Sequence, residues 1–391
     1  MSKVSRFVEV DDLSILQRLA TAQRQIANDG GSSSNSTFSF WEKTSWYPQV
    51  ARRLFHPLLL DPRNDCFVLF TVLMLFTVLP SAVWLMLDFA WWRAALHVAL
   101  VIQNAGSYTS VLHNSCHKKV YSVSWMNYIV PVLLGPLFGQ TWNTYYYHHI
   151  KHHHIEDNGP NDLSSTLRFR RDSIAHFAIY FLRFLLLVII ELPVYFVRRG
   201  RYWNAAASFS GEVASLAFVW GLAKFNTLGA LFVLFVPLII IRFGMMSGNW
   251  AQHAFIDQAN PTSNFKSSVT CIHHSYNRVA FNDGYHTSHH LHARRHWSEH
   301  PTHLVREVSV YYASRPVILQ DIDFMGLWVL LMLQRYNRLA QLYVHLGPES
   351  ERPSQQEIID MLKSRTRAFS DEQIRHHYPY EKARTSAVCY F

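Results

Sequence analysis

Histidine is the residue type best able to do chemistry in this chain, which contains 23 of them. The stretch "HHIKHHHIEDNG" at residues 148–159 holds five histidines within seven positions. Such a cluster either binds metal ions or forms a solvated basic patch. One cluster alone does not separate these interpretations, so the spacing of the other histidines must decide between them.

Similar spacing occurs in three further segments, each beside an apolar run. In "HNSCH", His113 and His117 lie four residues apart and therefore share one face of a helix. In "NWAQH", Asn249 and His253 have the same spacing. The third segment, "HTSHH", contributes His286, His289 and His290. A solvated charge patch does not explain four clusters at the ends of apolar runs, so we interpret them as metal ligands.

The cluster at 148–154 allows two registers. His149 and His153 share a helix face, and His154 points about 100° away, toward a second metal ion. His152 could instead replace His153, in an i, i+3 arrangement with His149. The spacing leaves both registers open, so both residues stay in the candidate set. That set is His113, His117, His149, His152, His153, His154, Asn249, His253, His286, His289 and His290.

This number of ligands indicates more than one metal ion. Zinc is satisfied by roughly four ligands, so about nine imidazoles suit two ions better than one. Calcium and magnesium prefer oxygen ligands, whereas imidazole binds iron, copper, nickel and zinc alike. Nearby carboxylates could orient the ring N–H groups, which metal-bound histidines require. The candidate carboxylates are Asp157, Asp162, Asp257 and Asp283.

The composition indicates a membrane protein. Of the 391 residues, 49% are hydrophobic and only 16% are charged, whereas a soluble domain averages about 25% charged. The net charge of +9 suits the anionic face of a membrane. The basic residues flank apolar runs instead of forming a groove-sized stripe, which argues against a nucleic-acid partner. The four cysteines show no CxxC spacing and predict neither structural zinc nor a disulfide framework.

Two apolar runs form the first predicted hairpin. Residues 67–87 carry no charge across the thickness of a bilayer, and a second run at 94–112 follows after a short connection. Lys118 and Lys119 follow this hairpin, so the positive-inside rule places its ends, and the histidines, in the cytosol. The polar N-terminus predicts no cleavable signal peptide.

Three more runs follow, at 179–197, 205–223 and 228–247. If all the histidine clusters build one site, they lie on one side of the membrane, so an even number of these runs must cross. The run 179–197 ends in "RRGR", which favours an interfacial position for it and a second hairpin from the other two. The alternative is that 205–223 does not cross, because it contains Glu212.

We therefore predict an all-α integral membrane protein with two transmembrane hairpins, about four crossings, and interfacial helices under a cytosolic helical cap. The broken apolar segment 126–147 is expected to lie in the membrane plane or to insert halfway. The predicted parts are an N-terminal head at 1–45 with a helix at 13–28 and a flexible linker, the membrane domain at 46–305, and a C-terminal cap and tail at 306–391.

The four clusters together resemble those of the membrane fatty acid desaturase and hydroxylase superfamily, over about residues 60–305. The matching motifs are His113-x3-His117, His149-x3-His153-His154, Asn249-x3-His253 and His286-x2-His289-His290. The resemblance implies two non-haem iron ions, O₂ as co-substrate, and binding of iron by Asn249 through a water. It also implies cytochrome b5 or ferredoxin as electron donor. The chain has no HPGG haem signature, so that donor is expected to be separate.

The expected function is O₂-dependent oxidation of unactivated C–H bonds in a lipid alkyl chain, most simply fatty acyl desaturation. A hydroxylase or an acetylenase would use the same site. A transition-metal transporter would hold its ligands near the bilayer midplane, not at the ends of apolar runs. The lipid is expected to enter from the bilayer along a tunnel walled by residues 142–147 and 245–250. The expected membrane is the endoplasmic reticulum of a eukaryote, and a bacterial inner membrane is the alternative. Chain length, lipid carrier and oligomeric state stay open.

Overall fold

The computed structural model describes residues 47–379, and these are mostly helical with two short strands. The predicted N-terminal helix at 13–28 and the linker after it lie outside the described residues. Four of the described helical segments are long and apolar enough to cross a bilayer. The predicted class, an all-α integral membrane protein, is therefore confirmed.

The first hairpin begins with a continuous helical span from Pro62 to Leu87. It consists of η3 (Pro62–Asn64), α4 (Asp65–Phe76) and α5 (Val78–Leu87). After a tight turn, α6 (Trp91–His117) packs back along α5. Its 27 residues span about 40 Å, enough to cross a bilayer. Because it carries polar side chains, α6 is not among the four segments that are apolar enough to be candidate membrane spans. The chain thus returns to the level at which it entered.

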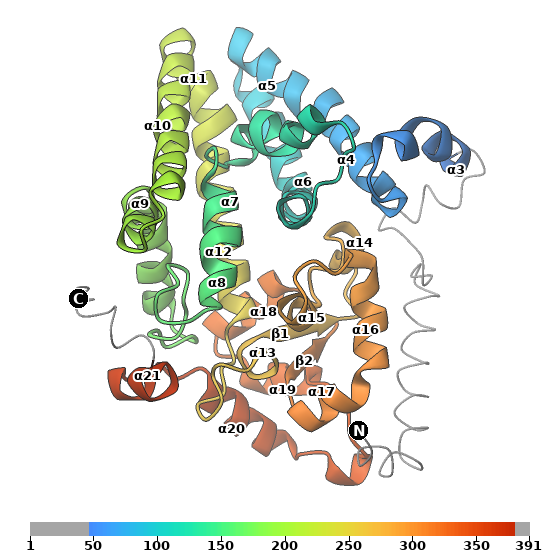
Figure 1. Cartoon of the computed structure of the whole chain (residues 1–391), viewed down its shortest axis with the longest axis vertical. Helices are drawn as coiled ribbons and strands as arrows, with labels where there is room; N and C mark the ends of the chain where they lie inside the picture. The colour runs from blue at the N-terminus through green and yellow to red at the C-terminus, as the bar shows by residue number, and fades with distance from the viewer. Residues whose placement is uncertain (1–46, 380–391) are drawn as a thin grey trace.

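The second hairpin consists of α10 (Tyr202–Phe225) and a returning span, Thr227–Gln252. That span contains α11 (Thr227–Ala230), η8 (Leu231–Phe235) and α12 (Val236–Gln252). Asn226, in the turn between them, donates a 2.9 Å hydrogen bond to the carbonyl of Met86 near the end of α5. The turns of both hairpins therefore meet at one end of the molecule (top of Figure 1), and the histidine-bearing ends lie at the other.

By length and composition, the helix α9 (Ile174–Arg198) is one of the four candidate membrane-spanning segments. Its contacts nevertheless place it beside the histidines along much of its length. Phe184 packs 4.8 Å from the ring of His148. Beyond its C-terminal end, Arg199 forms a 2.8 Å ion pair with Glu156. A crossing helix would carry one end about 37 Å away. These contacts favour the predicted interfacial position of 179–197 and do not favour the alternative for 205–223.

A broken segment connects α6 to the second histidine cluster. It contains η4 (Ser124–Tyr128), η5 (Ile129–Leu134), η6 (Pro136–Phe138), α7 (Thr144–His148), η7 (His149–His153) and α8 (His154–Glu156). Pro131 and Pro136 interrupt the helix ladder, since proline has no N–H. Gly139 has a φ of +68°, and a Cβ there would lie 2.5 Å from the Cα of Leu238. The segment is therefore broken, as its composition predicted, and it turns directly against α12, which the composition did not predict.

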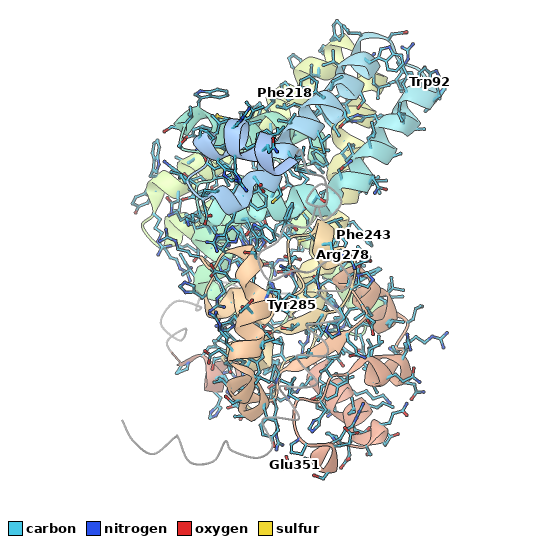
Figure 2. The ribbon with its side chains drawn as sticks, turned by 90° about the vertical axis from the view of Figure 1, so that its right-hand side faces the viewer. Trp92, Phe218, Phe243, Arg278, Tyr285 and Glu351 are labelled. Atoms are coloured by element: carbon cyan, nitrogen blue, oxygen red, sulfur yellow. The ribbon has the colours of Figure 1, made fainter. Side chains whose placement is uncertain are left out.

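The cap covers the histidine end of the helices (Figure 1). Strands β1 (Val269–Ile272) and β2 (Val317–Gln320) pair in parallel, with Val269 opposite Val317. They lie on opposite sides of the predicted boundary at 305/306, so the C-terminal part packs into the same unit. Figure 2 shows Trp92 at one end of the molecule and Glu351 at the other.

The cap helices are α13 (Asn264–Ser267), α14 (Tyr276–Val279), α15 (His286–Leu291), η9 (Trp297–Glu299), α16 (His300–Arg306), α17 (Val308–Ser314), α18 (Phe324–Met332), α19 (Tyr336–Leu342), η10 (Glu349–Glu351), α20 (Gln355–Arg365) and α21 (Asp371–His377). Three short elements precede the first hairpin, namely α3 (Tyr47–Val50), η1 (Ala51–Phe55) and η2 (His56–Leu58).

One buried cation holds the cap to the membrane helices. The guanidinium of Arg171 donates to six backbone carbonyls, three of them on its own loop. The others belong to Ala254 after α12 and to Arg365 and Arg367 at the end of α20. Burial lowers the pKa of Arg171 to about 9, a value at which the side chain stays charged near neutral pH. The loop, α12 and α20 are thereby fixed to one another.

Candidate metal centre

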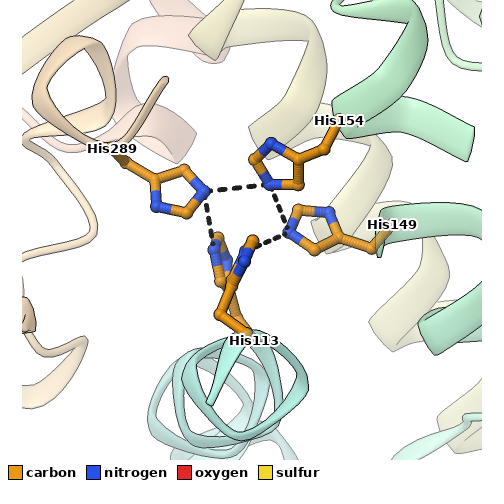
Figure 3. A group of neighbouring side chains, drawn as sticks. His113, His149, His154 and His289 are labelled. Carbon is orange, nitrogen blue, oxygen red and sulfur yellow. Dashed lines mark hydrogen bonds between the residues drawn. The ribbon is translucent and has the colours of Figure 1, made fainter. Parts of the chain in front are cut away.

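Five histidines from four elements form the first group. Each offers one ring nitrogen, and these atoms all lie within 4.8 Å of one another. His113 and His117 come from the end of α6, and the others from η7, α8 and α15. Figure 3 labels four of the rings, those of His113, His149, His154 and His289, which turn toward a common centre. The group consists of His113, His117, His149, His154 and His289.

The Nε2 atoms of this group form a chain of short contacts. His289 lies 3.0 Å from His113 and 3.1 Å from His154. His149 lies 3.1 Å from His154 and 3.1 Å from His117. A ring nitrogen has either one hydrogen to donate or one lone pair to accept with. It can satisfy only one such contact, so His149, His154 and His289 each have one contact that hydrogen bonding does not explain.

A metal ion explains the whole set of contacts. Imidazole nitrogens lie about 2.1 Å from zinc, and at that bond length two ligands at right angles are about 3.0 Å apart. The observed Nε2 separations have this value. The first group therefore fits a transition-metal ion in both donor type and spacing.

A second group lies beside the first. His153, His253 and His290 bring ring nitrogens within 4.8 Å of one another. The Nε2 of His286 joins them, 2.9 Å from that of His290 and 3.3 Å from that of His253. Neighbouring residues in the chain divide between the two groups, with His154 in the first and His153 in the second. His289 and His290 divide in the same way, so two ions bound here would be close neighbours.

Carboxylates and a carbonyl orient the rings of the second group. The Nδ1 of His153 lies 2.6 Å from the carboxylate of Asp162, and the Nδ1 of His290 lies 2.7 Å from Asp157. The Nδ1 of His253 lies 2.9 Å from the carbonyl of Ser267. These bonds place the proton on Nδ1 and leave Nε2 free to bind metal. Two of the four predicted carboxylates therefore orient rings. Asp257 pairs instead with Arg365, and Asp283 accepts from Gln252.

The electrostatics keep most of these rings neutral. Burial, reinforced by neighbouring imidazoles, lowers the pKa of His149, His286 and His289 well below the usual value. Burial alone would raise the pKa of Asp162, but the charge of His153 and its hydrogen bond lower it overall. The same pairing outweighs the burial of His153 and raises its pKa. Neutral imidazoles present the lone pairs that a metal ion requires.

A family model for fatty acid desaturases matches residues 89–319, which is more than half of the chain. The chain belongs to the fatty acid desaturase family. It is accordingly an oxidoreductase and an integral membrane protein with histidine groups able to hold metal. No curated protein matches this desaturase-family chain.

The structure gives the second cluster of this family member a definite register. His149 and His154 join the first group and His153 joins the second. His152 points elsewhere and forms a separate group with His148 and Asp162. Its Nε2 lies 3.1 Å from the carbonyl of Asn161. The structure therefore uses His149, His153 and His154, and His152 lies outside both main groups. The predicted sharing of a helix face is wrong, however, because His149 joins His154 and not His153. Residues 149–153 form a π-helical turn, in which residues five apart, not four, lie above one another.

The side chain of Asn249 lies near the histidines but makes no hydrogen bond to their rings. Its Nδ2 donates to the carbonyl of Ser164 at 3.0 Å and to the hydroxyl of Tyr180 at 2.7 Å. Its side-chain oxygen has no hydrogen-bond partner within residues 47–379, and the residue lines a cavity with His153 and His286. This position is compatible with the water-mediated role that the family resemblance implies.

The cavity beside the two groups measures about 90 Å³. Five of the histidines form one part of its wall, and Phe184, Met245 and Met246 supply apolar surface. The predicted tunnel walls, residues 142–147 and 245–250, each contribute some residues to the lining of this cavity. Trp250 does not, because it is buried and donates to the carbonyl of Arg171. The lining residues are His113, Gln140, Thr144, Tyr145, His148, His149, His153, Ser164, Phe184, Arg242, Met245, Met246, Asn249, Gln252 and His286.

Sequence reasoning did not single out the polar residues at the other part of the cavity wall. Gln140 and Thr144 come from the broken segment, and Arg242 comes from α12. A signal was present for Arg242, because a charged residue inside an apolar membrane run is rare and usually functional. Gln140 and Thr144 carried no such signal, since their position depends on how the broken segment folds back.

Proposed function

We propose that the chain catalyses O₂-dependent desaturation of a fatty acyl chain at two histidine-bound iron ions. The observation that carries the proposal is the division of neighbouring residues, His153 and His154 and again His289 and His290, between two adjacent imidazole groups. That arrangement builds two metal positions side by side at the wall of one cavity. One iron would need only one group.

When bound, the two irons would supply the oxidising power that removes hydrogen from an unactivated C–H bond with O₂ as oxidant. The protein's own residues position the substrate and exclude water. Phe184, Met245 and Met246 would hold the alkyl chain against the histidines. The bonds of Asn249 to Ser164 and Tyr180 would hold its oxygen toward the cavity, where it can fix a water.

Hydroxylation is the second candidate reaction at this site, and an acetylenase would use it too. Loss of a second hydrogen gives a double bond, whereas transfer of oxygen gives an alcohol, and the position of one C–H bond separates them. A separate electron donor, of the cytochrome b5 or ferredoxin type, belongs to the proposal. Lys118 and Lys151 lie beside the histidines at the ends of the membrane helices, which supports a cytosolic site by the positive-inside rule. In a eukaryotic cell, the proposed membrane is the endoplasmic reticulum.

The test is lipid profiling of host cells that express the full chain, its His289→Ala variant or its His345→Ala variant. His345 belongs to neither group and contacts the carbonyl of Pro348 in the cap. We expect a new unsaturated acyl product with the wild type and with His345→Ala, and none with His289→Ala at equal membrane insertion. Undiminished product with His289→Ala would contradict the proposal. A new alcohol in place of the alkene would favour the hydroxylase.

A further inference from the structure

A buried ion pair joins two membrane helices next to the cavity. Arg242 on α12 and Glu212 on α10 approach to 3.8 Å, and their side chains are only 9% and 7% exposed. Each residue lies well inside its helix, away from both ends. Charged groups inside a membrane are energetically unfavourable, so such a pair is a functional candidate by default.

Two threonines of the broken segment complete the network. The hydroxyl of Thr141 donates to Glu212 at 2.6 Å and accepts from the Nη2 of Arg242 at 2.8 Å. The hydroxyl of Thr144 also donates to Glu212. The carboxylate therefore has several partners, and the network holds the broken segment against both helices.

The guanidinium, in contrast, is only partly satisfied. It has five N–H groups, and the one hydrogen bond that it makes to residues 47–379 is that of Nη2 to Thr141. Arg242 lines the cavity together with Thr144 and Gln140. Unpaired donors of a buried charged group are costly. A plain alkyl chain in the cavity would leave these donors unpaired, whereas an oxygen acceptor on the substrate would satisfy them.

The charge balance selects the kind of oxygen. Glu212 already compensates the positive charge of Arg242, so a carboxylate or phosphate would bring an uncompensated charge into this membrane-embedded position. A carbonyl or hydroxyl oxygen brings none. Helix geometry gives the distance between this oxygen and the carbon that is oxidised at the histidines. Arg242 precedes Asn249 by seven residues on α12, which is about 10 Å along the helix axis. Asn249 lies at the level of the histidines.

We propose that Arg242, held by Glu212 and Thr141, binds a neutral oxygen carried along the substrate chain, a keto or hydroxyl oxygen within about 10 Å of the oxidised carbon. The substrate is thus an acyl or alkyl chain that bears an oxygen beyond its carboxyl group, not a plain hydrocarbon tail. This inference rests on the proposed lipid oxidation and identifies the class of lipid.

The experiment feeds cells that express the full chain with octadecanoic acid and with a series of hydroxyoctadecanoic acids whose hydroxyl moves along the chain. Mass spectrometry then locates the oxidised carbon in each product. We expect the oxidised position to move with the hydroxyl. We also expect oxygenated chains to be preferred by roughly tenfold to hundredfold, the effect of one hydrogen bond to a buried charged group.

The variant is Arg242→Met combined with Glu212→Gln, which removes both charges together. In this variant, hydroxyoctadecanoic acids and octadecanoic acid should be oxidised about equally well. The position of the oxidised carbon should no longer depend on the position of the hydroxyl. A matched control is Arg183→Met with Glu191→Gln, which removes a 2.9 Å ion pair on α9 and should leave the ratio unchanged. Oxidation at a fixed distance from the carboxyl end, with no preference for oxygenated chains, would overturn this inference alone. No new product from any chain would overturn the proposed function as well.

Discussion

Two buried polar regions lie close together in this protein and satisfy their polar atoms in opposite ways. Around Arg171, the guanidinium makes hydrogen bonds to six backbone carbonyls. Around the histidines, ring nitrogens contact other ring nitrogens, and several have more contacts than hydrogen bonding can satisfy. The first region needs nothing more and stabilises the fold. The second is complete only with metal ions.

This comparison predicts that the two regions fail differently when they are mutated. The largest effect on activity is expected for His154→Gln, because the Nε2 of His154 contacts both His149 and His289 at 3.1 Å. Formation of the lipid product should fall below detection. The thermal unfolding midpoint of the metal-free protein should stay within a few degrees of the wild type. A variant that keeps normal product formation would show that the first group does not carry the reaction.

The largest effect on stability is expected for Arg171→Met. Removing the guanidinium takes a donor from six carbonyls, four of which keep another donor, so the free energy of unfolding should fall by about 3–5 kcal/mol. Chemical denaturation in detergent micelles measures this change. Arg168→Met is the matched control, because Arg168 is partly exposed and pairs with Asp371 on the surface. It should cost less than about 1 kcal/mol, and equal losses in both variants would remove the distinction between the regions.

A smaller effect is expected where the two kinds of contact meet, at Asp162. Its carboxylate orients His153 and also accepts from the backbone and hydroxyl of Ser164. Asp162→Asn should weaken metal binding roughly tenfold to a hundredfold, as is usual for a residue that orients a ligand. Metal titration of the purified variant measures it, with Asp257→Asn as the control that should bind metal normally.

The smallest effect is expected at Asp257, which pairs with Arg365 at 2.9 Å. Burial alone would raise the pKa of Asp257, but Arg365 and neighbouring donors lower it overall. A lowered carboxyl pKa contributes stability above the unfolded value of 3.8, and that stability is lost as pH falls through the folded value. Asp257→Asn should therefore reduce stability by about 1–2 kcal/mol at neutral pH, because the asparagine oxygen can still accept a hydrogen bond from Arg365. Denaturation curves of both proteins should converge in acid, and a growing difference would contradict the assignment.

Much of this arrangement could be predicted from the sequence because apolar runs and four-residue spacings are local signals. The runs at 67–87 and 228–247 lie within membrane-length helices, and the clusters at His113 and His286 come together as expected. The positions of the histidines at the ends of the runs also sufficed to predict a shared site.

The register at 148–154 could not be predicted, and the reason is physical. Residues 149–153 form a π-helical turn, which has more residues per turn than the α-helix. A wheel of 3.6 residues per turn therefore places His149 beside His153, whereas the structure groups His149 with His154. The polar part of the cavity wall was missed for a different reason. Gln140 and Thr144 line the same cavity as Arg242 only because the broken segment folds back against α12, and that is a long-range contact.

The most direct test of the account is the metal content of the purified full-length protein, combined with anomalous X-ray scattering at the iron edge. The account predicts two irons per chain, one within each imidazole group and close together, and loss of iron in His154→Gln. A protein that forms its lipid product while free of iron, or that holds a single exchangeable zinc ion, would contradict it.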